Sequence, residues 1–289
     1  MSRRLTPPPD PLPQGKGEKK AQSRAYSSPP LAGGVGGGVE LLALPDFPLV
    51  RPGDDLAALI AGGLARAGIA LRASDCVAVA QKIVSKAENR LVALADVAPS
   101  AEAIALAAEV GKDPRLVEVI LSESTRVVRH RANLLIMEHR LGFVMANAGV
   151  DHSNVAALGE PDQVLLLPAD PDASAARLRE ALARLCGVAP GVVITDSFGR
   201  AWRRGTCGVA IGAAGIASLI DLRGQPDLFG RTLEVTVVGH ADEIAAAAGL
   251  VQGQAGEGTP VVLVRGLNGA APHAPAADLV RPQAEDLFR

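Results

Sequence analysis

Short apolar runs alternate with amphipathic or alanine-rich segments from about residue 39 to residue 264. Apolar runs bounded by polar residues, glycine or proline favour strands. Strands are expected at residues 39–44, 75–80, 134–138, 143–146, 192–194, 233–239 and 260–264. Helices are expected at residues 54–65, 100–110, 113–121, 174–185 and 244–251. Asp242, just before the last of these helices, is expected to cap its N-terminus.

The first 38 residues differ from the rest of the chain. They contain clustered prolines, a mainly basic patch and a glycine run, without apolar periodicity. This composition predicts a disordered Pro/Gly-rich tail, residues 1–38, and the length of the chain allows one large or two modest domains. A basic targeting arm is the alternative, but the segment has neither an amphipathic helix nor a hydrophobic stretch.

Composition and charge exclude several classes of protein. Apolar residues make up 48% of the chain, which is enough for a sizeable core. The formal net charge of -2 argues against a general nucleic-acid binder. Cys76, Cys186 and Cys207 form no CxxC pair, so neither a zinc site nor a disulfide framework is indicated. No apolar run is long enough to span a membrane, and a cytoplasmic protein is expected.

Residues 192–215 carry the densest candidate chemistry. A buried strand at 192–194 is expected to end in Thr195, Asp196 and Ser197, whose oxygen atoms suit a divalent cation. Arg200, Arg203 and Arg204 follow, and their planar guanidinium groups suit phosphate or carboxylate. The alternative is a strand, a polar turn and a surface arginine patch.

Two other strand ends offer complementary groups. Lys82 and Lys86 follow the strand at 75–80 and suit phosphates, although exposed lysines are often only solubilising. Asp151 and Asn154 follow the strand at 143–146 and could supply a metal ligand and a phosphate or base contact. A glycine-rich loop, residues 252–258, is flexible enough to fold over a ligand. Two aspartates that hold metal ions against a nucleotide polyphosphate would unify these parts.

Residues 123–131 are rich in charge. They are expected to form either a solvated connection or a polar edge of a substrate cleft. Several standard motifs are absent from the sequence: GxxxxGK[ST], GxSxG, HExxH, EF-hand spacing, and a GxGxxG between a strand and a helix.

The sequence resembles the coenzyme F420-0:γ-glutamyl ligases over residues 40–268. Matching runs include LPDFPLVRPGDDLAALI, VAVAQKIVSKAENR, GFVMANAGVDHSNV, GVVITDSFGRAWRRG, DLRGQPDLFGR and EVTVVGHADEIAAAAGLVQGQ. Asn89 stands where the family usually has glycine, and Gln254 can be glutamate in relatives. The resemblance implies a single domain, residues 39–289, with an α+β fold of mixed sheets, helices and two interlocked subdomains, and it implies a homodimer. Charge and apolar run length, not the resemblance, argue against nucleic-acid and membrane partners.

The resemblance also implies the reaction. GTP would phosphorylate the lactyl carboxylate of F420-0, L-glutamate would displace the phosphate, and further glutamate would be added through a γ-linkage. Mg²⁺ or Mn²⁺ at two sites would assist, with K⁺ as a helper ion. The negative charge of the γ-phosphate must be neutralised during its transfer. Water must be excluded because an acyl phosphate hydrolyses. The rival interpretations are a metal-dependent phosphohydrolase and a non-catalytic GTP-binding regulatory protein.

The residues implied by the resemblance fall into three groups. The metal ligands are Asp151 and Asp196 on one ion, and Ser197 and Gln254 on a second. Catalytic roles go to Asp151 and Asp196. The resemblance assigns no role to the arginines at 200, 203 and 204. From their chemistry we predict a catalytic role for Arg200, and binding of the phosphodiester or glutamate carboxylates by all three arginines. The nucleotide contacts are Leu44, Pro45, Asp46, Phe47, Gln81, Lys82, Lys86, Asn154, Leu250, Val251, Gln252, Gly253, Gln254, Ala255, Gly256 and Glu257.

Overall fold

The computed structural model describes residues 38–153, 155, 162–267 and 272–287. The predicted tail, apart from Gly38, lies outside the described residues. The helices are α1 Leu56–Arg66, α2 Gln81–Ala87, α3 Ala101–Val110, α4 Pro114–Ser122, α5 Pro171–Cys186 and α6 His240–Gln252. The strands are β1 Glu40–Ala43, β2 Cys76–Ala80, β3 Leu91–Ala93, β4 Ser124–Arg131, β5 Leu134–His139, β6 Val144–Ala146, β7 Gln163–Leu165, β8 Gly191–Gly199, β9 Thr206–Ala214, β10 Ile220–Asp221, β11 Val237–Val238 and β12 Val261–Arg265.

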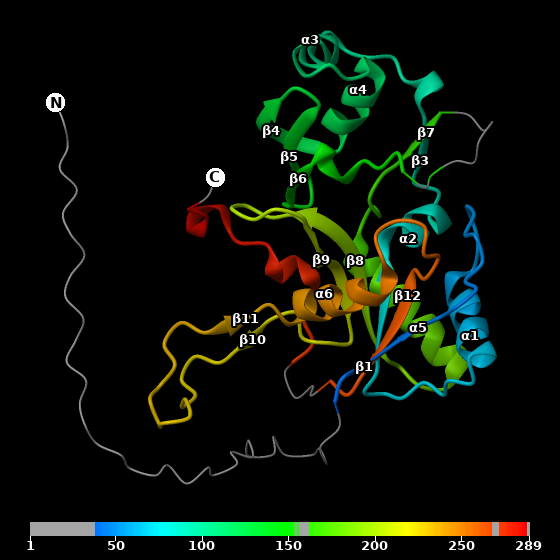
Figure 1. The fold of residues 1–289 in the computed structure, drawn as a ribbon, viewed down its shortest axis with the longest axis vertical. Helices are drawn as coiled ribbons and strands as arrows, with labels where there is room; N and C mark the ends of the chain where they lie inside the picture. The colour runs from blue at the N-terminus through cyan, green and yellow to red at the C-terminus, as the bar shows by residue number, and fades with distance from the viewer. Residues whose placement is uncertain (1–37, 154, 156–161, 268–271, 288–289) are drawn as a thin grey trace, which may run out of the picture. The chain divides into compact units, whose positions relative to one another are not determined.

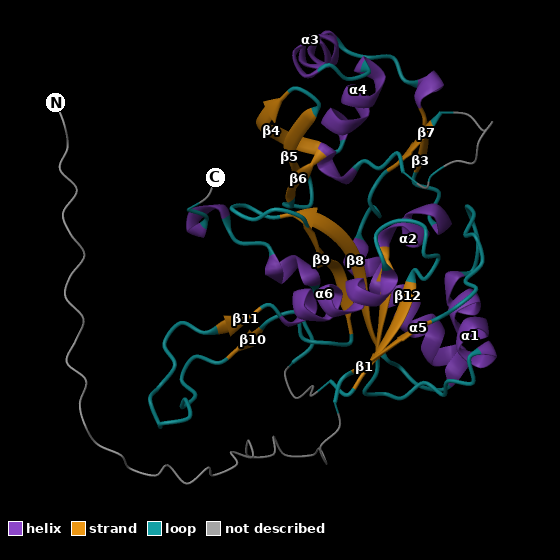
Figure 2. Ribbon diagram, in the orientation of Figure 1, coloured by secondary structure: helices purple, strands orange, loops and turns teal. Residues whose placement is uncertain are grey.

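A five-stranded mixed sheet, in the order β1-β12-β2-β8-β9, carries helices on both faces (Figures 1 and 2). β2 and β8 are parallel and the other pairs are antiparallel. Val77 and Val79 belong to one core cluster with residues of α1 and α5, whereas Cys76 and Ala78 pack with the alanines of α6. Because successive side chains of a strand point to opposite faces, one strand serves both cores. The expected α+β fold with mixed sheets is confirmed.

Strand β9 lies between α5 and α6, and a bulge makes this possible. Ile211 is the extra residue, because Ile194 pairs with Gly212 and Thr195 with Ala210. The bulge changes the face that the following residues present. A Cβ at Gly208 would collide with the backbone of α6, and one at Gly212 with the backbone of α5. Glycine at both positions therefore lets the two helices approach the strand closely.

A second core lies outside the main sheet. It packs α3 and α4 against the sheet β4-β5-β6, and these elements form one group in Figure 1. The chain enters this part through β3 and leaves it through β7, which pair antiparallel. Residues from about 91 to 167 are thus inserted between α2 and α5, two helices that pack against the main sheet.

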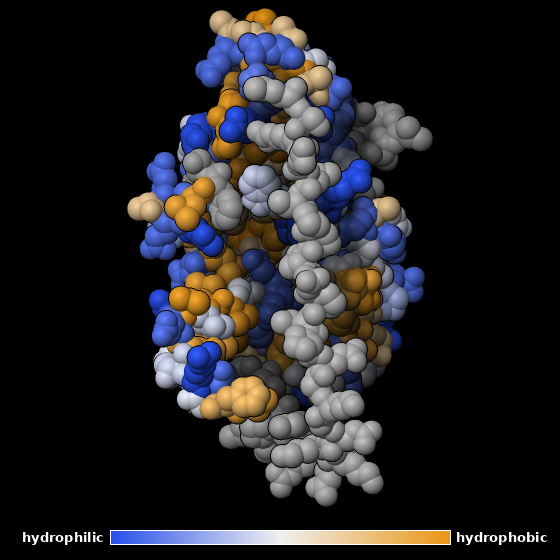
Figure 3. Space-filling view, turned by 60° about the vertical axis from the view of Figure 1, so that its left-hand side comes forward, coloured by the Kyte–Doolittle hydropathy of each residue, from blue (hydrophilic) through white to orange (hydrophobic). Residues whose placement is uncertain are grey.

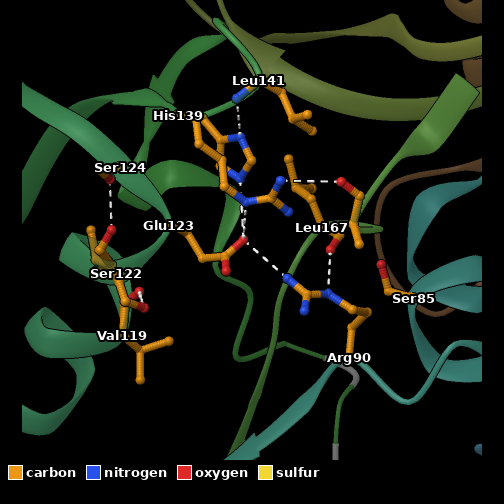
Figure 4. A network of polar contacts seen from close by, with 12 residues as sticks. Ser85, Arg90, Val119, Ser122, Glu123, Ser124, His139, Leu141 and Leu167 are labelled. Carbon is orange, nitrogen blue, oxygen red and sulfur yellow. Dashed lines mark hydrogen bonds and ion pairs between the residues drawn. The ribbon is translucent and has the colours of Figure 1, made fainter.

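Glu123 connects this second part to its surroundings (Figure 4). Its Oε2 atom accepts hydrogen bonds from Arg90 Nη2 at 3.0 Å and Arg140 Nε at 3.3 Å, and His139 Nε2 lies 3.5 Å away. Arg90 also donates to the carbonyl of Leu167. Burial alone would raise the pKa of Glu123, but contact with His139 and the charges of Arg90 and Arg140 outweigh it and lower the pKa to about 2.

Several sequence expectations are wrong in detail. The charged segment after residue 123 is strand β4, and a seven-residue helix, α2, follows β2 directly. β8 continues to Gly199 and does not stop at residue 194. Helix α5 begins at Pro171, three residues before the expected start, because Asp170 caps it. Within 233–239, only Val237–Val238 forms a strand.

Asp242 does not cap α6, contrary to expectation. It lies inside the helix, and its Oδ1 accepts a hydrogen bond from the backbone N–H of Ala210 at 2.8 Å. Asp172 of α5 likewise accepts a hydrogen bond from the backbone N–H of Ala213, at 2.8 Å. β9 is an edge strand, so these two carboxylates satisfy N–H groups that would otherwise be open to another chain. None of the helices within the described residues has the length and apolar character needed to span a bilayer.

Candidate functional site

A cavity of about 1310 Å³ opens where the carboxyl end of β2 meets the middle of β8. The two strands run parallel in register, with Ala80 opposite Thr195. Helix α2 begins directly after Ala80, so its first turn lies next to Asp196 and Ser197 of β8. The loop at 252–258 and residues 49–52 form other parts of the wall.

Strand β8 and the glycine-rich loop are joined by side-chain hydrogen bonds. Ser197 Oγ donates to Gln254 Oε1 at 2.7 Å, and Thr195 Oγ1 donates to Gln252 Oε1 at 3.1 Å. Gln252 in turn donates from Nε2 to the carbonyl of Pro260 at 3.2 Å. These contacts hold the loop along the cavity wall.

Asp196 is a half-buried carboxylate with few partners. Its Oδ1 accepts one hydrogen bond, from the backbone N–H of Ser197 at 2.8 Å. Burial raises its pKa to about 6, and the negative charge of Asp151 adds to the increase, while the hydrogen bond from Ser197 and the charge of Lys82 oppose it. Asp151 and Asp196 therefore act on one another electrostatically across the cavity.

Asp151 reaches the cavity from the segment between β6 and β7. It follows a short 3₁₀ turn, Asn147–Gly149, in which Asn147 and Ala148 both have positive φ. The backbone of Asp151 forms a bridge with Leu165 of β7, which fixes its position. Its Oδ2 pairs with Lys82 Nζ at 2.8 Å, and its Oδ1 accepts a hydrogen bond from Ser153 Oγ at 2.8 Å.

The oxygen donors at the cavity suit a hard divalent cation. Asp151, Asp196, Ser197 and Gln254 all line it and offer carboxylate, hydroxyl and carboxamide oxygens. In the described part of the chain, no three His, Cys, Asp or Glu side chains gather around one point. Mg²⁺ fits such a sparse set, because it keeps several waters and binds through one or two carboxylates and substrate phosphates.

Comparison with known proteins decides the family. The sequence profile described as F420-0:Gamma-glutamyl ligase matches residues 46–266. The chain belongs to this family. The protein named Coenzyme F420:L-glutamate ligase from Methanopyrus kandleri is 47% identical over 260 residues, which cover 88% of this chain and 100% of that relative. Proteins of the same name from Methanothermobacter thermautotrophicus and Archaeoglobus fulgidus are 44% and 41% identical, over 87% of this chain and 99% and 96% of their own lengths.

The nucleotide contacts implied by the F420-0:γ-glutamyl ligase family divide into two groups in this structure. Those that line the cavity are Gln81, Lys82, Lys86 and residues 252–257. Gln81 is buried, and its Nε2 has no hydrogen-bond partner among the described residues, which leaves an amide donor for a ligand. Those outside the lining are Leu44, Pro45, Asp46, Phe47, Leu250 and Val251, and Leu44 is buried in the core. Asn154 lies outside the described residues.

Arg200 is not part of the cavity lining, and several unpredicted residues are. Arg51 lies in the wall together with its neighbours Leu49, Val50 and Pro52. Arg51 lies close in sequence to the expected nucleotide contacts at residues 44–47, and this proximity could have indicated that it belongs to the site. Thr206 and Gly208 of β9 also line the cavity. Their place depends on the pairing of β9 with β8, which the sequence pattern did not predict.

Proposed function

We propose that this protein is a GTP-dependent ligase that joins L-glutamate to the carboxylate of coenzyme F420-0 and then adds further γ-linked glutamate. Family membership and the names of the relatives support the ligase reaction. The observation that carries the proposal is the cavity itself, which gathers Lys82, Lys86, Asp151 and Asp196 from three distant segments. Cations beside carboxylates are the arrangement that phosphoryl transfer requires.

The proposed reaction has two displacements. A carboxylate oxygen of F420-0 attacks the γ-phosphorus of GTP, and the bond to the β-phosphate oxygen breaks, so that its electron pair leaves with GDP. The glutamate amine then attacks the carbonyl carbon of the acyl phosphate. The carbon–oxygen bond breaks, its electron pair leaves with inorganic phosphate, and the amine proton is released to solvent or phosphate. Glutamate γ-carboxylates repeat the cycle.

The side chains of the cavity have distinct parts in this scheme. Lys82 and Lys86 hold and partly neutralise the phosphates. Asp151, Asp196, Ser197 and Gln254 would hold divalent metal, Mg²⁺ or Mn²⁺ at two sites, which when bound neutralises developing phosphate charge. The loop at 252–258, held to β8 by the Ser197–Gln254 hydrogen bond, limits the access of water to an acyl phosphate.

Mass spectrometry of F420-0 incubated with the protein, GTP, Mn²⁺ and L-glutamate tests the proposal. Products heavier by one and then more glutamyl residues are expected, with GDP formed in equal amount. Phosphate release that does not depend on glutamate would identify a phosphohydrolase. GTP binding without phosphate release would identify a regulatory protein. Parallel reactions with ATP and with added K⁺ test the preference for GTP and the helper role of K⁺.

We also propose a homodimer. Residues 222–236 form an arm between β10 and β11, on which Leu228, Phe229 and Val235 are largely exposed, Phe229 by 88%. The face turned to the viewer in Figure 3 exposes hydrophobic side chains in several groups. Apolar side chains gathered on a projecting arm are typical of a surface that pairs with a partner. Light scattering should give twice the chain mass, and Phe229→Asp should reduce it.

A further inference from the structure

The tip of the β8–β9 hairpin, residues 200–205, holds a group of side chains that the cavity alone does not explain. Arg203 and Arg204 are exposed and Arg200 is half-buried. Trp202 is 90% exposed and has a φ of 64°. No ion pair or side-chain hydrogen bond joins these four side chains to any described residue. Positive φ is rare for a bulky residue, and such outliers concentrate where a protein binds ligands.

The hairpin tip adjoins the cavity. Ser197 of β8 and Gly208 of β9 pair with one another and both line it. Thr206, which also lines the cavity, pairs with Gly199 and directly follows the tip. A strand advances about 3.3 Å per residue, so Arg200 lies about 10 Å along the chain from Ser197. The tip is therefore the outer continuation of the wall that carries Asp196.

The chemistry of the tip defines what it can bind. Three guanidinium groups match phosphate and carboxylate oxygens. An exposed indole offers an apolar face on which a planar aromatic ring can stack. We propose that residues 200–205 bind the acceptor substrate, an anion with a planar aromatic ring, and hold it with its carboxylate directed toward Asp196. The inference rests on the proposed ligase function and assigns the acceptor to the hairpin end of the cavity, while Lys82 and Lys86 hold the nucleotide.

Steady-state kinetics of the full chain test the two arginines. Arg203→Ala/Arg204→Ala should raise the KM for F420-0 at least about 10-fold, the scale of a lost charge-assisted contact. The KM for GTP should stay within about twofold of the original value, since the nucleotide is held elsewhere. Arg129→Ala/Arg131→Ala is the matched control, because it removes two exposed arginines from β4, away from the cavity. An unchanged KM for F420-0 in the first variant would overturn the inference.

Trp202 supplies an independent test, because it is the only tryptophan of the chain. Trp202→Phe keeps an aromatic face and should retain the KM for F420-0, whereas Trp202→Gly should raise it. Glycine accepts positive φ, so Trp202→Gly should unfold at the same or a higher temperature, which separates lost binding from lost folding. Indole fluorescence of the original chain should fall with F420-0 and not with GTP and Mn²⁺. Equal kinetics in the two variants would contradict a stacking role.

Failure of this inference can be told apart from failure of the proposed function. If the original chain forms no glutamylated F420-0, the ligase proposal itself is wrong. If the chain is active and the arginine variants keep the same KM values, only the role of the hairpin tip is wrong. A third result, in which Arg203→Ala/Arg204→Ala lowers the mass in light scattering with KM unchanged, would make the tip a contact between two copies and overturn acceptor binding.

Discussion

Asp196 and Glu123 are both substantially buried carboxylates, yet their surroundings differ. Glu123 Oε2 faces Arg90, Arg140 and His139 within 3.5 Å, and the pKa of Glu123 falls to about 2. Asp196 accepts a hydrogen bond from its neighbour Ser197, and burial together with the charge of Asp151 raises its pKa to about 6. The protein surrounds the charge of Glu123 with cationic and hydrogen-bonding partners, whereas Asp196 has no comparable set of partners.

The difference separates a structural carboxylate from a functional one. A buried charge costs free energy unless partners compensate for it. The Glu123 network supplies those partners and joins β5 and α4 to the chain at Arg90. Asp196 lacks them, and a strongly perturbed carboxylate in a cavity is typical of a site that a ligand completes.

The largest effect is expected from Asp196→Asn, which keeps the shape of the side chain and removes its charge. If Asp196 is a metal ligand that acts during phosphoryl transfer, ligation should fall about 1,000-fold, or about 4 kcal/mol, comparable to the loss of one preorganised electrostatic group. The rate of glutamylated F420-0 formation measures it. Glu123→Gln, the matched control, should keep its kcat. Asp196→Asn with more than about a tenth of the original rate would contradict the functional role.

Glu123→Gln should instead affect stability. The substitution leaves Arg90, Arg140 and His139 without their shared anion. Because Arg90 and Arg140 are partly exposed, the loss should be about 2 kcal/mol, below the usual cost of breaking a fully buried ion pair. Urea unfolding of metal-free protein measures it, with Arg126→Gln, which breaks the more exposed pair with Glu138, as the control expected to cost under about 1 kcal/mol. Equal losses in the two variants would show that the Glu123 network has no special role.

Lys82→Met should have an intermediate effect on nucleotide binding. It removes a cation that pairs with Asp151 at 2.8 Å and that opposes the raised pKa of Asp196. The KM for GTP should rise about 10-fold through the lost charge-assisted contact. The pH at which Mn²⁺ binding is half lost should move upward, because Asp196 then holds its proton more strongly. Lys112→Met, remote from the cavity, should change neither quantity.

The smallest effect concerns the pH dependence of stability in metal-free protein. The folded pKa of Asp196, about 6, lies above its unfolded value of about 3.9, so its contribution to stability is lost as pH rises through this window. The free energy of unfolding of Asp196→Asn should equal that of the original protein near pH 4 and exceed it near pH 7.5. The difference should be less than about 1 kcal/mol, because solvent screens the half-buried carboxylate.

Glu123 should show the reverse dependence. Its folded pKa, about 2, lies below an unfolded value of about 4.3, so its contribution is complete above about pH 5 and is lost as pH falls toward 2. Thermal unfolding of Asp196→Asn and Glu123→Gln between about pH 3 and pH 8, a range that spans much of the titration of both groups, measures how the stability of each variant depends on pH. Parallel trends would contradict the contrast between the two carboxylates.

Local signals predicted the starts of α1, α3 and α4, but not those of α2, α5 and α6. Asp55, Ser100 and Asp113 each accept a hydrogen bond from an N–H of the first turn that follows, as their sequence positions indicated. The expectations failed where tertiary contacts decide the structure. β4 exposes most of its charged residues on a strand whose partner is β5, so its composition resembles a loop. The role of Asp242 depends on Ala210, 32 positions away.

The cavity was less predictable than the fold. Asp151 and Asp196 were identified as candidate ligands from their polar neighbours, but their meeting requires the parallel pairing of β2 with β8 and the bridge between Asp151 and Leu165. No local pattern encodes either contact, because both join residues far apart in the sequence. Arg51, which also lines the cavity, was missed although it lies close in sequence to the predicted contacts at residues 44–47.

A crystal structure with Mn²⁺ and GDP tests the central claim most directly, since anomalous scattering locates the ion. The account predicts Mn²⁺ in the cavity, bound by oxygens of both Asp151 and Asp196 at about 2.1–2.3 Å, between the distances typical of Mg²⁺ and Ca²⁺. The GDP phosphates should complete its coordination. GDP bound in the cavity without Mn²⁺ near these two carboxylates, or Mn²⁺ bound elsewhere on the chain, would contradict it.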